Sequence, residues 1–305
     1  LFNRQKQTLA GLLAGKDQTH AERLEWARMR MDPTDISDVT ATTYSYLVNG
    51  NGTRENWTGL FQPGERVRLR IINASAMTNF NVRLPGLAMT VVGADGLSVA
   101  PVEVDEFQIA IAETYDVIIQ PQEARPYAFV AEAIDRSGLI RATLAPQLGM
   151  VAPVPELRKR PLLTMRDMGM EMSAMHGGAS GEGDHSKPAA PHDMNHSMRD
   201  PSVAPHVKMG PGVATLSPMP VDRLGDKPTG LEDVGHRVLT YAALRSRDPN
   251  PDVRAPSRSI DVHLTANMER YMWSIDGQTM SQIGTPIPFR LGERVRINLI
   301  NDTMM

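Results

Sequence analysis

The sequence predicts an all-β protein made of sandwich or barrel domains, and three observations indicate this fold class. Apolar residues alternate with polar ones over short stretches, which is the spacing of half-buried strands. Turn pairs such as Asn49-Gly50 and Asp95-Gly96 separate these stretches. The phrase FQPGERVRLRIIN, from Phe61 to Asn73, returns as FRLGERVRINLIN, from Phe289 to Asn301, so we expect a duplicated β-domain.

The first element that we expect is a helix that follows Thr19. Thr19 and Glu22 have the spacing of a capping box, in which a hydroxyl and a carboxylate satisfy free backbone amides. Leu24, Ala27 and Met31 then form a narrow apolar stripe, and Pro33 is expected to end the helix. We interpret this segment as a packing or connecting helix.

Strands are expected throughout residues 41–146. Val67, Leu69 and Ile71 alternate with arginines. The same alternation recurs around residues 80–84, 107–111, 117–119 and 127–129. Because short strands and frequent turns fill about a hundred residues, this segment predicts one complete β-domain.

The arginines on the alternate face, Arg66, Arg68 and Arg70, suit either a nucleic-acid surface or a solvated sheet face. Acidic residues are interspersed with them, and the net charge is −3. A surface that binds phosphate needs an excess of positive charge, so we favour a solvated face and expect no nucleic-acid partner. The chain also lacks a run of eighteen apolar residues, so we expect no membrane span.

Residues 147–235 are expected to form a linker, because the strand pattern gives way to Pro, Gly, Ser, Asp and His. A segment so poor in aliphatic side chains buries too little surface to offset chain entropy, which predicts a flexible connection. Its composition is also unusual, since it holds many of the chain's 19 methionines and 8 histidines.

The methionines and histidines of this linker indicate metal binding. Thioether sulfur favours Cu(I), and imidazole binds Cu(I) and Cu(II) alike. Methionines that fill a core have aliphatic neighbours, whereas these lie among Gly, His, Asp and Ser. Copper is therefore favoured, with zinc or nickel as the open alternative for a His-rich segment. The candidate ligands are Met165, Met168, Met170, Met172, Met175, His176, His185, His192, Met194, His196 and Met198.

Strand patterning returns in residues 236–305 with the second copy of the repeated phrase. Asp276-Gly277 precedes this copy, as Asn49-Gly50 precedes the first. Val295, Ile297 and Leu299 are expected to take the inward positions of Val67, Leu69 and Ile71. Because the first copy continues for about seventy residues and the second for four, we expect a truncated product or part of a longer chain.

Elsewhere the sequence offers little catalytic chemistry. His263 is expected to face solvent from a strand, His20 to lie on a helix surface and His236 to lie at a loop end. Neither a Gly-x-Ser-x-Gly elbow nor a phosphate-binding loop occurs. The absence of cysteine excludes disulfides, thiolate metal sites and a cysteine nucleophile within this chain.

Several long phrases resemble the copper-resistance multicopper oxidases of bacteria, the copper resistance protein A group. These phrases are MRMDPTDISDV (29–39), NWTGLFQPGERVRLRIINASAM (56–77), PGLAMTVVGADG (85–96), VDEFQIAIAETYDVI (104–118), LTMRDMGM (163–170) and NMERYMWSIDG (267–277). The resemblance implies cupredoxin-like Greek-key domains. Residues 1–40 would end the first domain and form a connecting helix, 41–146 would be the complete second domain, 147–235 the linker and 236–305 the truncated start of the third.

The same resemblance implies a periplasmic enzyme that uses copper to oxidise a substrate, with Cu(I) as one candidate, and that reduces O2 to water. In this family a type 1 copper is held by Cys, His and Met, and a trinuclear copper cluster is held by His-x-His pairs. The chain contains no cysteine and no His-x-His. The catalytic coppers are therefore expected only in a full-length parent, and this chain alone is expected to be inactive.

Two hypotheses of other classes stay open beside the oxidase. One is a non-catalytic protein that sequesters copper, with the β-domains as a scaffold for the metal-binding linker. The other is an all-β adhesion or interaction module, which predicts no copper binding.

Overall fold

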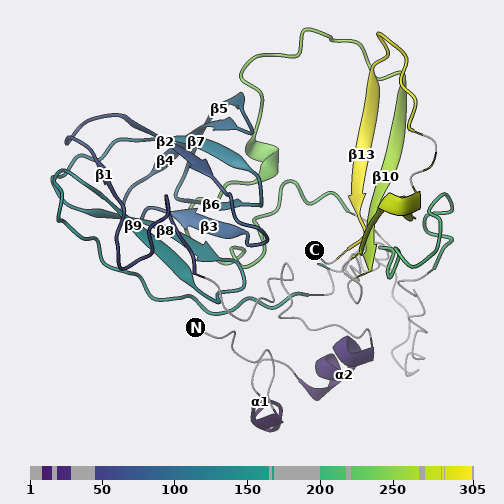
Figure 1. Cartoon of the computed structure of the whole chain (residues 1–305), viewed down its shortest axis with the longest axis horizontal. Helices are drawn as coiled ribbons and strands as arrows, with labels where there is room; N and C mark the ends of the chain where they lie inside the picture. Colours follow the sequence, from purple (N-terminus) through teal and green to yellow (C-terminus); the bar gives the residue numbers. More distant parts are fainter. Residues whose placement is uncertain are drawn as a thin grey trace, which may run out of the picture. The chain divides into compact units, whose positions relative to one another are not determined.

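The computed structural model describes residues 9–15, 19–28, 45–164, 167, 200–217, 221–267, 272–282, 284 and 286–303. The chain divides into two compact units. Unit 1 comprises Leu1–Leu163 and Arg223–Pro249, and unit 2 comprises Thr164–Asp222 and Asn250–Met305. Most of the regular secondary structure is β-strand (Figure 1), which confirms the predicted all-β class.

Two short helices, α1 (Leu9–Leu13) and α2 (His20–Arg28), come first. α2 begins directly after Thr19, as predicted, and His20 is exposed on it. The predicted apolar stripe is wrong, because Leu24 and Ala27 are exposed, while Met31 lies outside the described residues. Trp26 is buried instead, and an indole removes a large apolar area from water.

Unit 1 holds two sheets that lie as two layers (Figure 1). One sheet has the strand order β1-β9-β8-β3-β6, and the other has the order β2-β7-β4-β5. The strands are β1 (Thr58–Leu60), β2 (Val67–Ile72), β3 (Phe80–Arg83), β4 (Met89–Ala94), β5 (Leu97–Val104), β6 (Glu106–Ile109), β7 (Thr114–Ile119), β8 (Tyr127–Ala133) and β9 (Leu139–Ala145).

The connections of unit 1 cross repeatedly between the layers. Consecutive strands are neighbours in the pairs β4–β5 and β8–β9, whereas the other connections lead from one sheet to the other. β1 pairs parallel with β9, and the other strand pairs of this unit are antiparallel. This topology is that of a Greek-key sandwich, the fold that the resemblance implied.

The core of unit 1 lies between the two sheets. Side chains in β7 alternate between buried and half-buried positions, which confirms the period of two predicted there, and β4 shows the same alternation. Val91, Phe107 and Val117 are fully buried there. Each such side chain stabilises the fold by about 1.5–3 kcal/mol relative to an exposed one.

The outer face of β2 carries the predicted solvated arginines. Arg68 and Arg70 are exposed, and both form ion pairs with Asp116 on the neighbouring strand β7. Val67, Leu69 and Ile71 point the other way and pack against the core. β2 therefore has one solvated face and one face packed against the core, as its alternation predicted.

The predicted turns of both units have the backbone that their residues favour. Asn49-Gly50, Asp95-Gly96 and Asp276-Gly277 have positive φ at both positions. Asn, Asp and Gly tolerate this region, and such turns suit the twist of a hairpin.

Unit 2 contains a sheet of order β12-β11-β10-β13. Its strands are β10 (Arg258–Asn267), β11 (Met272–Ile275), β12 (Gln278–Thr279) and β13 (Val295–Asn301). A 3-10 turn, η5 (Met280–Gln282), follows β12, and another, η3 (Tyr241–Ala243), belongs to unit 1. β13 runs parallel to β10 over seven paired residues, and the two strands lie side by side in Figure 1.

The expected inward positions of β13 are not buried. Val295 is half-buried, while Ile297 and Leu299 are 47% and 68% exposed. Strand pairing places Trp273 and Ile275 of β11 on the same face, and these are exposed as well, whereas Val262 and Ala266 of the central strand β10 are buried there. The prediction is wrong for Ile297 and Leu299 because β13 is an edge strand of this sheet and the described part of unit 2 has no second sheet to cover it.

Three segments within or beside the predicted linker pack against the sheets. The strap, residues 150–163, and the return segment, residues 223–249, belong to unit 1. The cover segment, residues 200–217, belongs to unit 2. Each contributes buried apolar residues, namely Ala152, Leu231, Leu239, Ala204, Val207, Val213 and Leu216.

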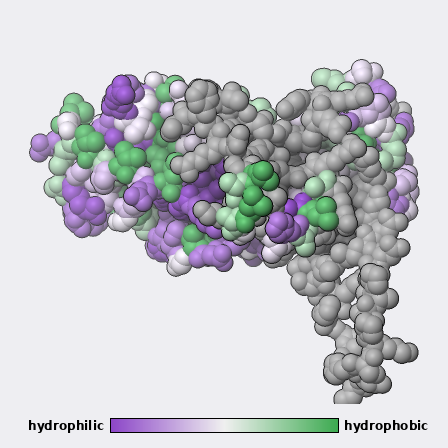
Figure 2. All heavy atoms as spheres, turned by 90° about the horizontal axis from the view of Figure 1, so that it is seen from below, coloured by the Kyte–Doolittle hydropathy of each residue, from purple (hydrophilic) through white to green (hydrophobic). Residues whose placement is uncertain are grey.

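The surface of unit 1 is mixed in character. Hydrophilic and hydrophobic side chains are intermingled over the part of it visible in Figure 2. None of the helices in the described ranges has the length and apolar character that a membrane span requires.

Candidate functional site

The predicted metal ligands of the linker lie outside the described residues. This holds for Met165, Met168, Met170, Met172, Met175, His176, His185, His192, Met194, His196 and Met198. Their role as ligands stays a prediction. The residues that flank them, in the strap and the cover segment, are described.

The cover segment follows these ligands in the chain and lies across the polar face of the unit 2 sheet. Lys208 donates its amide to the Asp276 carbonyl at 3.0 Å, and Ala214 donates to the Ala266 carbonyl at 2.8 Å. Ser274 Oγ donates to the Gly212 carbonyl at 2.8 Å. A side chain at Gly277 would collide with the Lys208 backbone, so the close approach requires glycine there.

His263 lies beneath this cover, and the prediction that it faces solvent is wrong. The residue is 6% exposed, and its Nδ1 is 2.5 Å from Asp302 Oδ2. Asp302 is held in turn by the Ser217 amide, which donates to Oδ1 at 2.9 Å. Strand alternation does place His263 on the polar face, but the cover segment makes that face an interior one.

His206 of the cover segment packs edge-on against His263, with ring centroids 4.8 Å apart. Its Nε2 lies 3.7 Å from Asp276 Oδ1. Imidazoles held by carboxylates are typical of metal sites. Even so, the described ranges contain no group of three His, Asp or Glu residues placed to hold a metal ion.

The catalytic coppers of a multicopper oxidase do not fit the residues of this chain. A type 1 site needs a cysteine thiolate, and the sequence has none. The His-x-His pairs expected for a trinuclear cluster are also missing from the sequence. No redox step is therefore assigned to residues of this chain.

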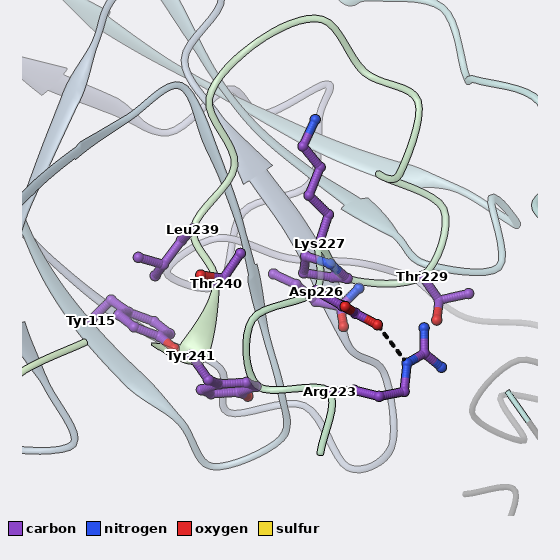
Figure 3. A pocket seen from close by; sticks show the side chains of 10 residues that line it. Tyr115, Arg223, Asp226, Lys227, Thr229, Leu239, Thr240 and Tyr241 are labelled. Carbon is purple, nitrogen blue, oxygen red and sulfur yellow. Dashed lines mark hydrogen bonds and ion pairs between the residues drawn. The ribbon is translucent and has the colours of Figure 1, made fainter. Parts of the chain in front are cut away.

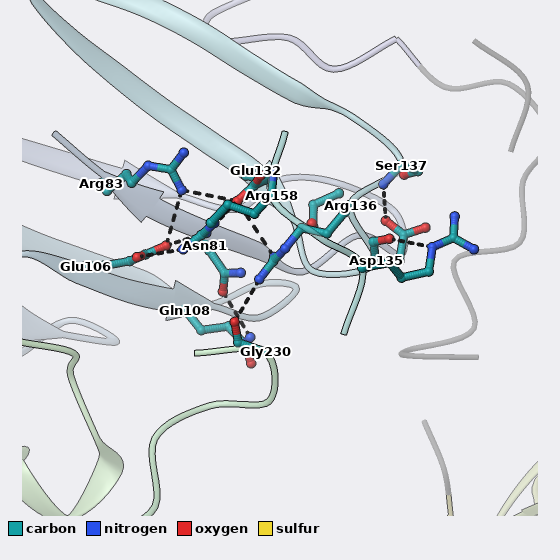
Figure 4. A network of polar contacts seen from close by, with 12 residues as sticks. Asn81, Arg83, Glu106, Gln108, Glu132, Asp135, Arg136, Ser137, Arg158 and Gly230 are labelled. Carbon is teal, nitrogen blue, oxygen red and sulfur yellow. Dashed lines mark hydrogen bonds and ion pairs between the residues drawn. The ribbon is translucent and has the colours of Figure 1, made fainter. Parts of the chain in front are cut away.

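A buried charge network lies in unit 1, between the outer face of its five-stranded sheet and the strap (Figure 4). Glu106 and Glu132 are fully buried on neighbouring parts of this face. Arg158 of the strap contacts both carboxylates, with Nη2 at 2.6 Å from Glu106 Oε1 and its amide at 2.9 Å from Glu132 Oε1. Arg83 and Arg136 approach Glu132 at 3.1 and 3.8 Å.

His236 of the return segment completes this network. Its Nε2 is 2.7 Å from Glu106 Oε2, and its side chain is 38% exposed. His236 does lie in a loop, as expected, but its ring also contacts the buried carboxylate of Glu106. Buried carboxylates of this kind are stable only when cations and hydrogen bonds compensate them.

The network lowers the pKa of one of its carboxylates, Glu132. Burial acts to raise the pKa of Glu132, but the Arg158 amide and the guanidinium groups of Arg136 and Arg158 hold that pKa below its ordinary value. Burial lowers the pKa of Arg136. Because the pKa of Glu132 is depressed, its contribution to stability is complete above the ordinary glutamate pKa and is lost as pH falls through the lower folded value.

Sequence reasoning missed this network. Glu106 and Glu132 lie at outward positions of their strands, where alternation predicts solvent contact. Arg158 lies in a stretch with no periodicity. Only the long-range docking of the strap brings these residues together, and a single sequence carries no signal for that contact.

A pocket of about 220 Å³ opens in unit 1 beside the return segment (Figure 3). Burial, and then Glu113, raise the pKa of Tyr115 and Tyr241, so both phenols stay protonated at neutral pH. Arg223 pairs with Asp226 at 2.9 Å, and Lys227 donates to the Val234 carbonyl. The charged side chains of the pocket thus bind other groups of the protein, so they do not indicate which ligand the pocket would take. The lining residues are Gln108, Tyr115, Arg223, Asp226, Lys227, Pro228, Thr229, Leu239, Thr240 and Tyr241.

Comparison with known proteins shows which proteins the chain is similar to. The family model described as multicopper oxidase matches residues 13–147. A copper resistance protein A homolog of Pseudomonas syringae pv. tomato (strain ATCC BAA-871 / DC3000) is 45% identical over 330 residues, covering 100% of this chain and 55% of that protein. Copper resistance protein A of Escherichia coli is 46% identical over 324 residues, covering 95% of this chain and 53% of that protein.

A second Pseudomonas syringae pv. tomato relative, also a copper resistance protein A, is 43% identical over 323 residues, covering 94% of this chain and 52% of that protein. The chain thus spans about half the length of these curated relatives. The identity extends over both units and the segment between them. The chain belongs to the copper-resistance multicopper oxidase family.

Proposed function

We propose that the chain is part of a periplasmic multicopper oxidase that confers copper resistance. The observation that carries this proposal is identity of 43–46% to copper resistance protein A over 94% or more of the chain. The whole protein would oxidise a substrate, with Cu(I) as one candidate, and pass the electrons to O2, which becomes water. Copper and O2 are then its partners.

Within that protein, this chain would supply structure and a copper-binding segment. Residues 41–146 form the middle cupredoxin-like domain, residues 1–40 complete the preceding domain, and residues 236–305 begin the next one. Residues 147–235 connect the two domains. Since the chain contains neither cysteine nor His-x-His, it has no oxidase activity by itself.

The methionines and histidines between residues 165 and 198 would bind copper. Several soft donors within a short stretch can wrap a Cu(I) ion without a rigid site. Their neighbours are small and polar, so burial in a core does not account for them.

Titration of the full chain with Cu(I) under reducing conditions tests this role. Replacing Met165, Met168, Met170, Met172 and Met175 by leucine keeps side-chain size but removes the thioether sulfurs. We expect this variant to lose at least half of the bound Cu(I). Met280→Leu is the matched control, because Met280 is 86% exposed and lies outside the segment. Equal binding by all three proteins would contradict the proposal.

The absence of cysteine favours a second candidate, a protein that sequesters copper without catalysis. The native protein isolated from its source separates the two. An oxidase shows intense blue absorption and consumes O2 when Cu(I) is supplied. A sequestering protein binds Cu(I) but shows neither property.

A further inference from the structure

One carboxylate in unit 1 holds two segments that are far apart in the chain. Arg158 of the strap places Nη1 at 3.0 Å from Glu106 Oε2 and Nη2 at 2.6 Å from Oε1. His236 of the return segment places Nε2 at 2.7 Å from the same Oε2. The two partners are separated by 78 positions (236 − 158), and the candidate copper ligands lie between them.

Backbone contacts strengthen the return side of this arrangement. Leu239 donates its amide to the Glu106 carbonyl at 3.0 Å, and the Glu106 amide donates to the Arg237 carbonyl at 3.2 Å. Arg237 also pairs with Asp105 at 2.7 Å and with Glu103. The return segment is therefore attached to β6 and its neighbours by both main chain and side chains.

The strap side depends more on side chains. Besides the Glu106 contacts, the Arg158 amide donates to Glu132 and the Ala152 amide donates to Thr143 Oγ1 at 3.2 Å. Arg158 is the cation that joins the strap to the two buried carboxylates. Without it, Glu106 would keep, among the described residues, the contact with His236, the charge of Arg83, whose Nη1 is 3.7 Å away, and the more distant charge of Arg136.

A fully buried carboxylate couples the groups that hold it. Removing one partner leaves a charge that is only partly compensated in a medium of low polarity. Water then reaches the carboxylate, and its contact with the remaining partner weakens. Strap and return segment should therefore loosen together, although they share no stretch of sequence.

We propose that Glu106 is a clasp that holds the strap and the return segment on unit 1 at once. The excursion of the chain between Arg158 and His236 is then anchored to unit 1 at both of its ends. The statement that the clasp positions a copper-binding segment rests on the proposed function. The clasp itself rests only on the contacts of Glu106.

Hydrogen–deuterium exchange of the full chain without metal tests the clasp. Glu106→Gln keeps the shape of the side chain but removes its charge. Hydrogen bonds to charged groups contribute about 1.5–3 kcal/mol, so we expect about tenfold or greater acceleration at strap and return amides, such as Arg158 and Leu239. Peptides from β4 and β7 should exchange as in the unmodified chain, which shows that the fold is intact.

Glu103→Gln is the matched control. Glu103 pairs with Arg237, its side chain is 59% exposed, and among the described residues it forms no ion pair with the strap. Its loss should accelerate exchange in the return segment by less than about threefold and leave the strap unchanged. If Glu106→Gln affects one segment alone, or neither, the clasp is wrong.

A second variant keeps the proposal testable if Glu106→Gln fails to fold. Arg158→Gln alters the strap alone, yet the clasp predicts faster exchange at Arg237 and Leu239 in the return segment. Unchanged exchange there would overturn the proposal. Because no copper is present, this outcome is independent of the Cu(I) titration, which tests the proposed function separately.

Discussion

The two copies of the repeated phrase, Phe61–Asn73 in unit 1 and Phe289–Asn301 in unit 2, share their local structure but differ in burial. Gly64 has a φ of 83° and Gly292 a φ of 77°. The glutamate after each glycine donates its amide three residues back, at 2.9 Å in both copies. Its carboxylate also accepts the amide three residues earlier, at 2.8 Å in the first copy and 3.1 Å in the second.

The final asparagine of each copy makes the same local turn. Asn73 Oδ1 accepts the amide and hydroxyl of Ser75, at 3.1 and 2.7 Å. Asn301 Oδ1 accepts the amide and hydroxyl of Thr303, at 2.9 and 2.8 Å. Asn and Ser or Thr side chains favour such contacts two residues along the chain.

The surroundings of the two copies differ. β2 pairs with β7 in a sandwich, whereas β13 pairs with β10 in a single sheet. Phe61 is 4% exposed and packs near Tyr127, with ring centroids 5.9 Å apart, while Phe289 is 55% exposed. One phrase thus gives the same turn twice, but burial depends on what lies opposite the strand.

The largest expected difference in stability between the two copies is at their first residue, Phe61 or Phe289. Phe61→Ala should lower the free energy of unfolding of unit 1 by about 3–5 kcal/mol, because it removes a buried ring. Phe289→Ala should cost less than about 1 kcal/mol, because that ring is already half in solvent. Urea titration followed by hydrogen exchange of peptides from each unit measures both. Similar losses would show that Phe289 is buried in solution.

The asparagines that end the copies should differ next. Asn73 is 5% exposed, and its Nδ2 donates to the Thr78 and Ile109 carbonyls at 2.8 and 3.2 Å. Asn73→Ala should cost about 2–4 kcal/mol, since two carbonyl oxygens lose a donor. Asn301→Ala, at an exposed position, should cost about 1 kcal/mol or less. The same exchange experiment distinguishes them, and an equal cost would contradict the comparison.

The turn glycines should respond equally. Apart from the adjacent residues, no heavy atom of the described part of the chain lies within 4 Å of a Cβ placed at Gly64 or Gly292, so backbone strain is what opposes alanine there. Gly64→Ala and Gly292→Ala should each cost about 1–2 kcal/mol, the cost of an L-residue in the left-handed region. Thermal unfolding of both variants checks this. A difference larger than about 1 kcal/mol would mean that the turns depend on their surroundings.

The smallest expected effect concerns the exposed face of β13. Leu299→Lys should change stability by less than about 0.5 kcal/mol, because Leu299 is 68% exposed. It should also reduce binding of a hydrophobic dye to the full chain. Leu69→Lys is the control, and it should destabilise unit 1 strongly because Leu69 packs against the core. A large loss of stability with Leu299→Lys would show that this face is covered.

Several features could be predicted from the sequence because they depend on neighbouring residues. The positive φ of Asn49-Gly50 and Asp276-Gly277, the alternation of β2 and β7, and the start of α2 all follow from short-range sterics and hydrogen bonding. The repeat also identified two related β-elements. The candidate copper ligands came from composition alone, and they stay a prediction.

The buried polar groups could not be predicted in this way. Glu106, Glu132 and His263 occupy outward strand positions, and alternation assigns such positions to solvent. The strap and the cover segment, which have no periodic pattern, make these positions interior. Pattern reasoning is therefore weakest where an irregular segment docks on a sheet.

The sequence by itself thus determined the turns, the strands, the duplication and the family of this protein. The tertiary structure decided which strand faces are buried, which carboxylates are paired and where the irregular segments lie. The physical reason is the distance along the chain over which the interactions act. A turn depends on φ, ψ and hydrogen bonds within a few residues, whereas burial depends on surfaces that are brought together from distant parts of the chain.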